Sequence, residues 1–405
     1  MGDPSMKCKK LTHHHQQEQP LLPGLPDEIA ELCLSKVRRP SLVFSVCKSW
    51  RRLLYSPCFT DPFLSLYTTL LPTTTNPSSQ SLHFSAFDPL SNEWEPVPPP
   101  PQDQPLLLLH HPSFLSRKLP IQTVTVSTNL VLLAATTHNF NPALSRPLLF
   151  NPILRTWLFG PPILTPRRWC AAGSLGGAVY VASGIGSQFS SDVARSVEKW
   201  DLECFSGWRW EKMEGRLKDG RFSRDAVDAV GWKGRLCMVN VKGDAAKEGL
   251  VYDVGKDAWR DMPEGMLKGW RGPVAAMDEE VLYTVDETKG SLRKYDQEID
   301  CWVEIISSGM LVGAQQIAAA AGKVCVVCDG ANDGGIVVVD VRAAPPRIWM
   351  LDTPPGFQAL TVHILPRMSR GYCNIDKTWL IFCFVLDFED LNLSVVTHRP
   401  IPMSP

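Results

Sequence analysis

The sequence has almost no net charge, since 41 Lys and Arg residues stand against 42 Asp and Glu residues. Electrostatic binding to nucleic acid or to an anionic membrane surface needs an excess of positive charge. Long apolar runs are also missing, because the strongest one, residues 379–388 (WLIFCFVLDF), falls far short of a membrane-spanning helix. These two absences indicate a protein that works on neither nucleic acid nor a membrane.

Paired zinc-ligand sets are absent, although the chain has 12 cysteines. Cys325 and Cys328 form a single C-x-x-C inside an apolar run that predicts a buried strand, and no second pair stands at zinc spacing. We therefore expect no metal and no other cofactor. No apolar signal-peptide core precedes the first domain, which favours a reducing, cytoplasmic or nuclear compartment. Residues 1–20, polar and His-rich, are expected to be a disordered leader.

Residues 21–60 predict a small helical module. Pro26 suits the first position of a helix, and the acidic residues after it complement the helix dipole. Pro40 ends this helix, and Ser41 can cap a second one that Pro57 stops. The apolar stripe of the second helix contains Leu42, Val46, Trp50 and Leu54. A module of this size buries too little surface to be very stable alone, so we expect it to dock on another protein.

The rest of the chain repeats one unit six times. In each unit an apolar strand ends in Asp or Asn, a turn follows, and a Trp opens the next strand. Successive Trp residues differ by 63, 53, 49, 43 and 47 positions, and the six are Trp94, Trp157, Trp210, Trp259, Trp302 and Trp349. With a strand–turn–strand hairpin ahead of this pattern, each unit has the four strands of a propeller blade. We expect the Asp or Asn to hold the turn and each Trp to pack between blades.

The helical module resembles the F-box. The residues that carry the resemblance are Leu25-Pro26, Val46-Cys47-Lys48-Ser49-Trp50-Arg51 and Ser56-Pro57-Cys58-Phe59. The resemblance implies binding to the SKP1 adaptor through Leu25, Pro26, Ile29, Leu42, Val46, Cys47 and Trp50. The alternative is that some of these apolar side chains, particularly Cys47 and Leu53, form only the small core of the module.

The repeats resemble the kelch repeat, most closely at Val197-Glu198-Lys199-Trp200-Asp201, although the paired glycines after the second strand survive only in part, as at Ser183-Gly184. Residues 21–368 as a whole resemble plant F-box/kelch-repeat proteins of the SKP1-interacting type. The implied fold is mainly β: a six-bladed kelch-type β-propeller over residues 61–368, preceded by an α-helical F-box with a core of its own. Unit one lacks an innermost strand, and we expect residues 359–365 to supply it beside residues 63–70, leaving 369–405 as a tail outside the ring.

The resemblance implies the substrate-recognition subunit of an SCF ubiquitin ligase, which reaches cullin and RING proteins through SKP1. A kelch scaffold acting outside any ligase is the alternative. An enzyme is not expected, because a copper oxidase would need clustered ligands and the repeat region has only scattered His residues, among them His363. A G-x-S-x-G nucleophile and a Gly-rich phosphate loop are also missing.

Three arginines occupy equivalent places ahead of a first strand: Arg168, Arg224 and Arg271. Such positions ring one mouth of a propeller channel, where guanidinium groups could grip the carboxylates of an acidic substrate. The alternative is that they pair with acidic groups or carbonyls of the neighbouring blade.

Overall fold

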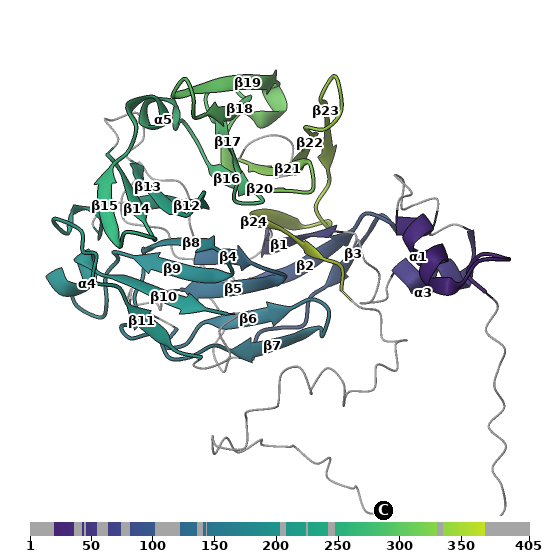
Figure 1. The fold of residues 1–405 in the computed structure, drawn as a ribbon, viewed down its shortest axis with the longest axis horizontal. Coiled ribbons are helices and arrows are strands. Elements are labelled where there is room, and N and C mark those ends of the chain that lie inside the picture. Colours follow the sequence, from purple (N-terminus) through teal and green to yellow (C-terminus); the bar gives the residue numbers. More distant parts are fainter. Residues whose placement is uncertain are drawn as a thin grey trace, which may run out of the picture.

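The computed structural model describes residues 20–35, 43, 46–54, 64–73, 82–101, 122–135, 141–142, 144–202, 208–223, 226–241, 248–329 and 335–368. Strands dominate these residues and form six four-stranded sheets around a ring, with the N-terminal helices beside the outer edge of one sheet (Figure 1). The six-bladed propeller predicted from the repeats is therefore confirmed. The expected leader up to residue 19 and the tail from residue 369 lie outside the described residues.

The described part of the N-terminal module contains the helices α1 (Asp27–Ser35) and α3 (Lys48–Leu54), with the helical residues Val43 and Val46 between them. The helix α1 begins directly after Pro26, as predicted. The second helix does not run on unbroken from Ser41, because Cys47 is non-helical although Val43 and Val46 on its N-terminal side are helical. In one straight helix Val43 and Leu53 would point about 80° apart. The break allows both side chains to enter the same buried cluster.

Each blade has four antiparallel strands, which follow one another from the innermost to the outermost. The first three blades are β24 (Phe357–Pro366), β1 (Leu64–Pro72), β2 (His83–Asp88) and β3 (Glu93–Pro96); β4 (Gln122–Val126), β5 (Asn129–Ala134), β6 (Leu148–Asn151) and β7 (Thr156–Phe159); and β8 (Ala171–Leu175), β9 (Ala178–Ala182), β10 (Val197–Asp201) and β11 (Trp210–Lys212). The other three are β12 (Ala226–Trp232), β13 (Arg235–Val241), β14 (Gly249–Asp253) and β15 (Ala258–Asp261); β16 (Val274–Met277), β17 (Val281–Asp286), β18 (Ser291–Asp296) and β19 (Cys301–Ser307); and β20 (Ala314–Ala320), β21 (Lys323–Cys328), β22 (Ile336–Asp340) and β23 (Arg347–Leu351). Two short helices, α4 (Ser191–Arg195) and α5 (Glu264–Gly269), lie in connections.

The turn between the third and fourth strands is held by the repeated Asp or Asn. In blade one the Asp88 carboxylate accepts the backbone N–H of Leu90 at 2.9 Å, and in blade two the Asn151 amide oxygen accepts that of Leu154 at 2.9 Å. The Asp residues that end the third strands of blades four, five and six accept the same kind of bond. These bonds satisfy backbone donors that the hairpin turn leaves without a strand partner, as predicted.

The repeated Trp residues join neighbouring blades. Each of the first five donates its indole N–H to a backbone carbonyl that lies just beyond the outer strand of the preceding blade, at 2.6 to 3.3 Å; the bonds are Trp94 to Asp352, Trp157 to Pro98, Trp210 to Pro161, Trp259 to Gly215 and Trp302 to Met266. The aromatic body of each Trp packs against an apolar cluster between the two blades. Packing between blades is confirmed for these five.

For the sixth Trp, Trp349, the prediction that it packs between blades is wrong. In blade five Trp302 pairs with Tyr295, the residue before the final Asp of the third strand. In blade six the residue in that register is Ile348, which pairs with Val339, while Trp349 pairs with Val338. Because successive side chains of a strand point to opposite faces, Ile348 enters the cluster between blades five and six. Trp349 points the other way and is 42% exposed.

This register predicts unequal costs for two Trp substitutions that look equivalent in sequence. Trp259→Ala should lower the free energy of unfolding by roughly 3 kcal/mol, because it removes packing and an inter-blade hydrogen bond. Trp349→Ala should cost about 1 kcal/mol or less, as expected for a largely exposed side chain. Urea unfolding of the two variants measures the difference, and equal losses would contradict the register described for blade six.

The two ends of the ring are joined in blade one. The C-terminal strand β24 pairs antiparallel with β1 from Leu64 opposite Pro366 to Pro72 opposite Phe357, and it takes the innermost place in the sheet. Inside this pairing the Thr361 hydroxyl lies 2.8 Å from that of Thr69. The expectation that residues 359–365 supply the missing strand is confirmed.

A buried histidine lies where this closing strand meets blade two. The two ring nitrogens of His363 in β24 lie 2.8 Å from the Thr123 hydroxyl and 3.0 Å from the Thr125 hydroxyl, both on β4. Burial disfavours the charged imidazolium and lowers the pKa of His363 to about 4. The neutral ring therefore links the innermost strands of the first and second blades.

The His363 environment predicts a loss of stability in mild acid. The unfolded chain takes up a proton below the ordinary histidine pKa of about 6.5, while folded His363 resists protonation down to about 4. Stability present at pH 7 should therefore be lost as the pH falls through this window, by roughly 2 kcal/mol between pH 7 and pH 5. His363→Gln can retain both hydrogen bonds without titrating, so its urea midpoint should change less with pH. Parallel pH profiles for the two proteins would rule this role out.

Candidate functional site

The helical module exposes four large apolar side chains. They are Leu25, Ile29, Leu32 and Val46, and each is between 40% and 57% exposed. Ile29 and Leu32 are three residues apart on α1, so they share one face of the helix. Four large apolar side chains on so small a module are typical of a surface that is covered by another protein. Because the module resembles the F-box, we call these four residues the F-box surface.

The opposite side of the module forms its core. Leu34, Val43 and Leu53 are buried together, and Trp50 packs against them. The Trp50 indole donates a hydrogen bond to the Leu21 carbonyl at 2.7 Å, which ties the segment before α1 to α3. Leu53 therefore lies in the core of the module, as the alternative interpretation held, and Trp50 has a structural role as well, while Cys47 is only half-buried.

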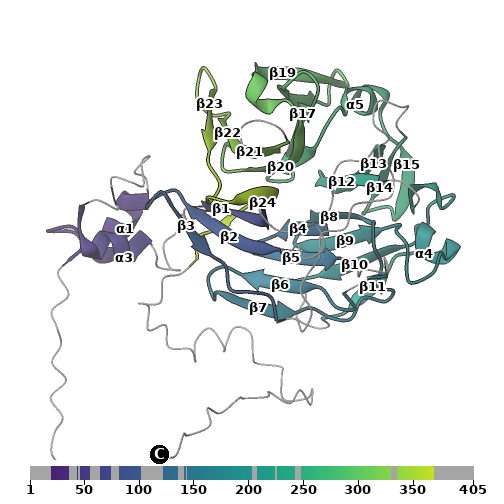
Figure 2. The same ribbon diagram turned by 180° about the vertical axis from the view of Figure 1, so that it is seen from behind.

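The core of the module also contains a residue of the propeller. Leu90, at the turn between β2 and β3, is 8% exposed and completes the same cluster. The expectation that the helices and the propeller have separate cores is therefore wrong. The physical reason is that the two helices alone leave one side of their small core open, and the blade-one turn lies next to them (Figure 2). The sequence carries only an ordinary turn leucine there, so no motif could have indicated the contact.

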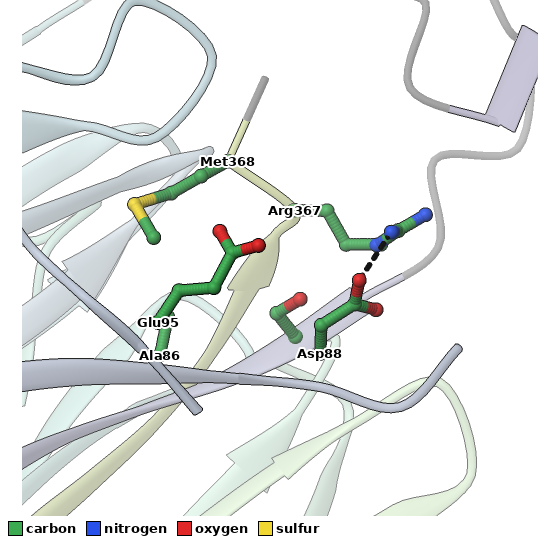
Figure 3. Close-up of a pocket in the computed structure, with 6 residues that line it drawn as sticks. Ala86, Asp88, Glu95, Arg367 and Met368 are labelled. Atoms are coloured by element: carbon green, nitrogen blue, oxygen red, sulfur yellow. Dashed lines mark hydrogen bonds and ion pairs between the residues drawn. The ribbon is translucent and has the colours of Figure 1, made fainter. Parts of the chain in front are cut away.

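A buried ion pair supports the turn that carries Leu90. The Arg367 guanidinium, just after β24, lies 2.6 Å from the Asp88 carboxylate, and both side chains are almost fully buried. The pair borders a small pocket lined also by Ser65, Ala86, Glu95 and Met368 (Figure 3). Asp88 holds the Leu90 N–H through its other oxygen. The ring-closing strand, the blade-one turn and the helical module are thus connected through one carboxylate.

The seven residues predicted to bind SKP1 fall into three groups. Leu25, Pro26, Ile29 and Val46 are exposed on the outside of the module. Cys47 and Trp50 are half-buried. Leu42 lies outside the described residues. Leu32, which is also exposed, was not among the seven, although its place one turn along from Ile29 on α1 follows from helical periodicity.

The three predicted arginines do not form one described cluster. Arg168 is half-buried and precedes β8, Arg271 is exposed and precedes β16, and Arg224 lies outside the described residues. The backbones of Arg168 and Arg271 are equivalent, since each carbonyl accepts the N–H of a residue just after the second strand, Ile185 at 3.0 Å and Glu287 at 3.4 Å. Neither guanidinium has an acidic or carbonyl partner among the described residues, so the pairing to a neighbouring blade is not seen for these two.

The residue before Arg168 does form a buried ion pair, which sequence reasoning missed. The Arg167 guanidinium contacts the Glu198 carboxylate and donates to the Ser183 carbonyl at 3.1 Å and the Ser196 hydroxyl at 3.0 Å. It fastens the start of blade three to the segment before its third strand. Two adjacent arginines therefore have different environments, one enclosed and paired and the other open on one side.

The cysteine motif is structural. Cys325 and Cys328 both lie in β21 and are buried, and burial raises the pKa of each thiol to about 12. Such thiols stay protonated and unreactive near neutral pH. In the part of the chain that the structure describes, no group of three or more His, Cys, Asp or Glu side chains is placed to hold a metal ion. The described helices include none with the length and apolar character needed to cross a bilayer.

Comparison with known proteins gives a consistent set of relatives. The chain is 52% identical over 378 residues to the F-box/kelch-repeat protein SKIP25 of Arabidopsis thaliana, covering 90% of this chain and 94% of that protein. It is 22% identical over 286 residues to the Arabidopsis F-box protein AFR, covering 67% and 70% of the two chains. It is 22% identical over 335 residues to the Arabidopsis F-box/kelch-repeat protein SKIP4, covering 80% and 85%. No family model matches the sequence.

Proposed function

The chain belongs to the F-box/kelch-repeat proteins, and we propose that it is the substrate-recognition subunit of an SCF ubiquitin ligase. In this role the F-box surface binds a SKP1-type adaptor, and through it cullin and RING proteins. The propeller binds the protein to be ubiquitinated. The transfer chemistry belongs to the other subunits, so no catalytic residue is assigned to this chain. We place this activity in the cytoplasm or the nucleus, where free cysteine thiols such as those of Cys325 and Cys328 stay reduced.

The observation that carries the proposal is the division of the helical module into two sides. Its core side is closed by Leu90 of the propeller, while Leu25, Ile29, Leu32 and Val46 stay exposed. If the helices served only to stabilise the propeller, an exposed face of Leu and Ile side chains would bring no benefit and would promote aggregation. An adaptor that covers this face accounts for its composition.

The geometry of the ring supports a separate place for the substrate. Leu64, where the chain from the F-box enters β1, pairs with Pro366 at the end of the innermost strand β24. Because every blade repeats the same strand order, the innermost strands all begin at the opposite face of the ring. We call this the strand-start face. A protein bound there would not compete with the chain that leads to the F-box.

Capture of a SKP1-type adaptor tests the proposal. The purified full-length chain is mixed with the adaptor and run on a gel-filtration column, and we expect the two to co-elute. Addition of the cullin and RING subunits should shift the whole assembly to a larger size. If the adaptor elutes alone while the chain is folded, the ligase role fails and a kelch scaffold remains as the function.

A further inference from the structure

The strand-start face carries an arginine stacked on a tryptophan. The Arg168 guanidinium carbon lies 4.6 Å from the centre of the neighbouring Trp169 ring. Stacking on an indole holds the planar guanidinium in one orientation and leaves its edge available for a ligand. Both residues are half-buried, so the surrounding residues restrict the movement of both side chains.

The backbone under this pair is strained. Trp169 has a φ angle of +51°, in the left-handed region that bulky residues rarely adopt. Two backbone hydrogen bonds between Arg168 and Ile185, at 2.9 and 3.0 Å, hold it there. The facing Gly184 is also required, because a Cβ on it would lie only 2.9 Å from the Arg168 carbonyl oxygen. Strain kept in this way is frequent at binding sites.

The charge of Arg168 is not compensated by any described side chain. Burial lowers the pKa of Arg168, and its Nε atom is enclosed without a hydrogen-bond acceptor. Glu198 is already taken by Arg167. Among the described residues, no hydrogen bond or ion pair joins the Arg168 side chain to an acidic group. A partly buried guanidinium in this position favours an incoming anion.

Apolar side chains accompany this charge. Leu164, four residues before Arg168, is 54% exposed, and Phe189 in the loop after β9 is 53% exposed. The two segments pack together, because a Cβ on Gly186 would lie 3.7 Å from the Thr165 side chain. A ligand that reaches Arg168 can therefore cover apolar surface on the same face of blade three.

We propose that the Arg168–Trp169 pair is the anchor for an acidic segment of the protein to be ubiquitinated. Because Nε is enclosed, the ligand's carboxylate accepts two parallel hydrogen bonds from the terminal Nη1 and Nη2 groups of Arg168, and an apolar residue beside it packs on Leu164 and Phe189. Arg271, exposed on the same face, attracts further acidic residues of the segment and raises the association rate. The inference rests on the proposed function, because it names the substrate class of the same propeller.

Selection from a displayed library of random peptides tests the anchor directly. The full-length chain is immobilised, and the peptides retained by wild type are compared with those retained by Arg168→Ala and by Arg347→Ala, a control on the outer strand β23. Wild type and the control should enrich acidic peptides with an adjacent apolar residue. Arg168→Ala should weaken binding of one such labelled peptide by about 10- to 100-fold. Replacing the peptide's carboxylates by amides should have a similar effect.

The side chain of Arg168 makes no described hydrogen bond, so Arg168→Ala should fold. If Arg168→Ala does not fold, Arg168→Lys replaces it as the test variant. Lysine keeps the positive charge but cannot donate two parallel hydrogen bonds, so this variant should still weaken binding. Absence of acidic enrichment, or enrichment that survives both variants, overturns the anchor. Adaptor co-elution is measured on the same variants and should be unchanged. A failed anchor with normal adaptor capture leaves the ligase role intact, while failed capture with acidic enrichment removes the ligase role alone.

Discussion

A chain that ends at Pro355 should not form a stable propeller. It lacks β24, which supplies the innermost strand of blade one and buries Ala359, Leu360, Val362 and Leu365. Each of the larger side chains contributes roughly 1.5–3 kcal/mol on burial, so their sum approaches the whole stability of a typical domain of about 5–15 kcal/mol. The truncation also exposes strand edges in blade one that invite aggregation. Circular dichroism and thermal unfolding of the truncated chain provide the measurement.

The matched control is a chain that ends at Met368. It retains β24 and the Arg367–Asp88 ion pair, so it should unfold like the full-length protein and capture the adaptor equally well. Removing only residues 369–405 thus separates the effect of a missing strand from that of a shorter chain. A Pro355 truncation with unchanged melting temperature would show that the ring does not depend on this strand.

Ile29→Asp combined with Val46→Asp should abolish capture of a SKP1-type adaptor. Covering two carboxylates with an apolar partner surface costs several kcal/mol, which corresponds to a loss of at least about 100-fold in affinity. Both side chains are exposed in the free protein, so the melting temperature should stay within a few degrees. Affinity capture on the purified adaptor and thermal unfolding measure the two quantities.

A pair of exposed apolar residues on the propeller provides the control. Ile299 and Val303 on blade five are 64% and 47% exposed, and Ile299→Asp with Val303→Asp makes the same chemical change away from the helices. This control should capture the adaptor normally. Equal capture by both double variants would exclude the F-box surface, and equal loss would indicate a nonspecific effect of added negative charge.

The contact of Leu90 with the core of the helical module affects how the proposed substrate receptor would position a bound protein. Because a propeller side chain completes the core of the helical module, the module cannot rotate freely about the connecting residues without exposing that core. Under the proposed function, the distance between an adaptor on the F-box surface and a substrate on the strand-start face would then be set by the fold. A flexible linker between separate cores would not set it.

The sequence by itself determined the architecture, because the repeat period of a propeller is visible in the sequence. The Asp or Asn, the turn and the Trp recur at a similar spacing, and each unit can satisfy its turn locally. Counting strands even predicted that residues 359–365 close the ring, since an unpaired innermost position can be filled only by a spare strand. The helical module was predicted from helical periodicity and from a short motif that resembles the F-box.

Only the tertiary structure decided what depends on contacts between distant segments. Asp201 and Trp210 in blade three stand nine residues apart, as do Asp340 and Trp349 in blade six, yet the strand register buries the indole in one blade and turns it outward in the other. Arg168 and Arg271 occupy equivalent backbone positions, but only Arg168 lies on an indole and is partly enclosed. Burial and charge compensation depend on which side chains a neighbouring blade brings within a few ångströms, and spacing along the chain does not encode that distance.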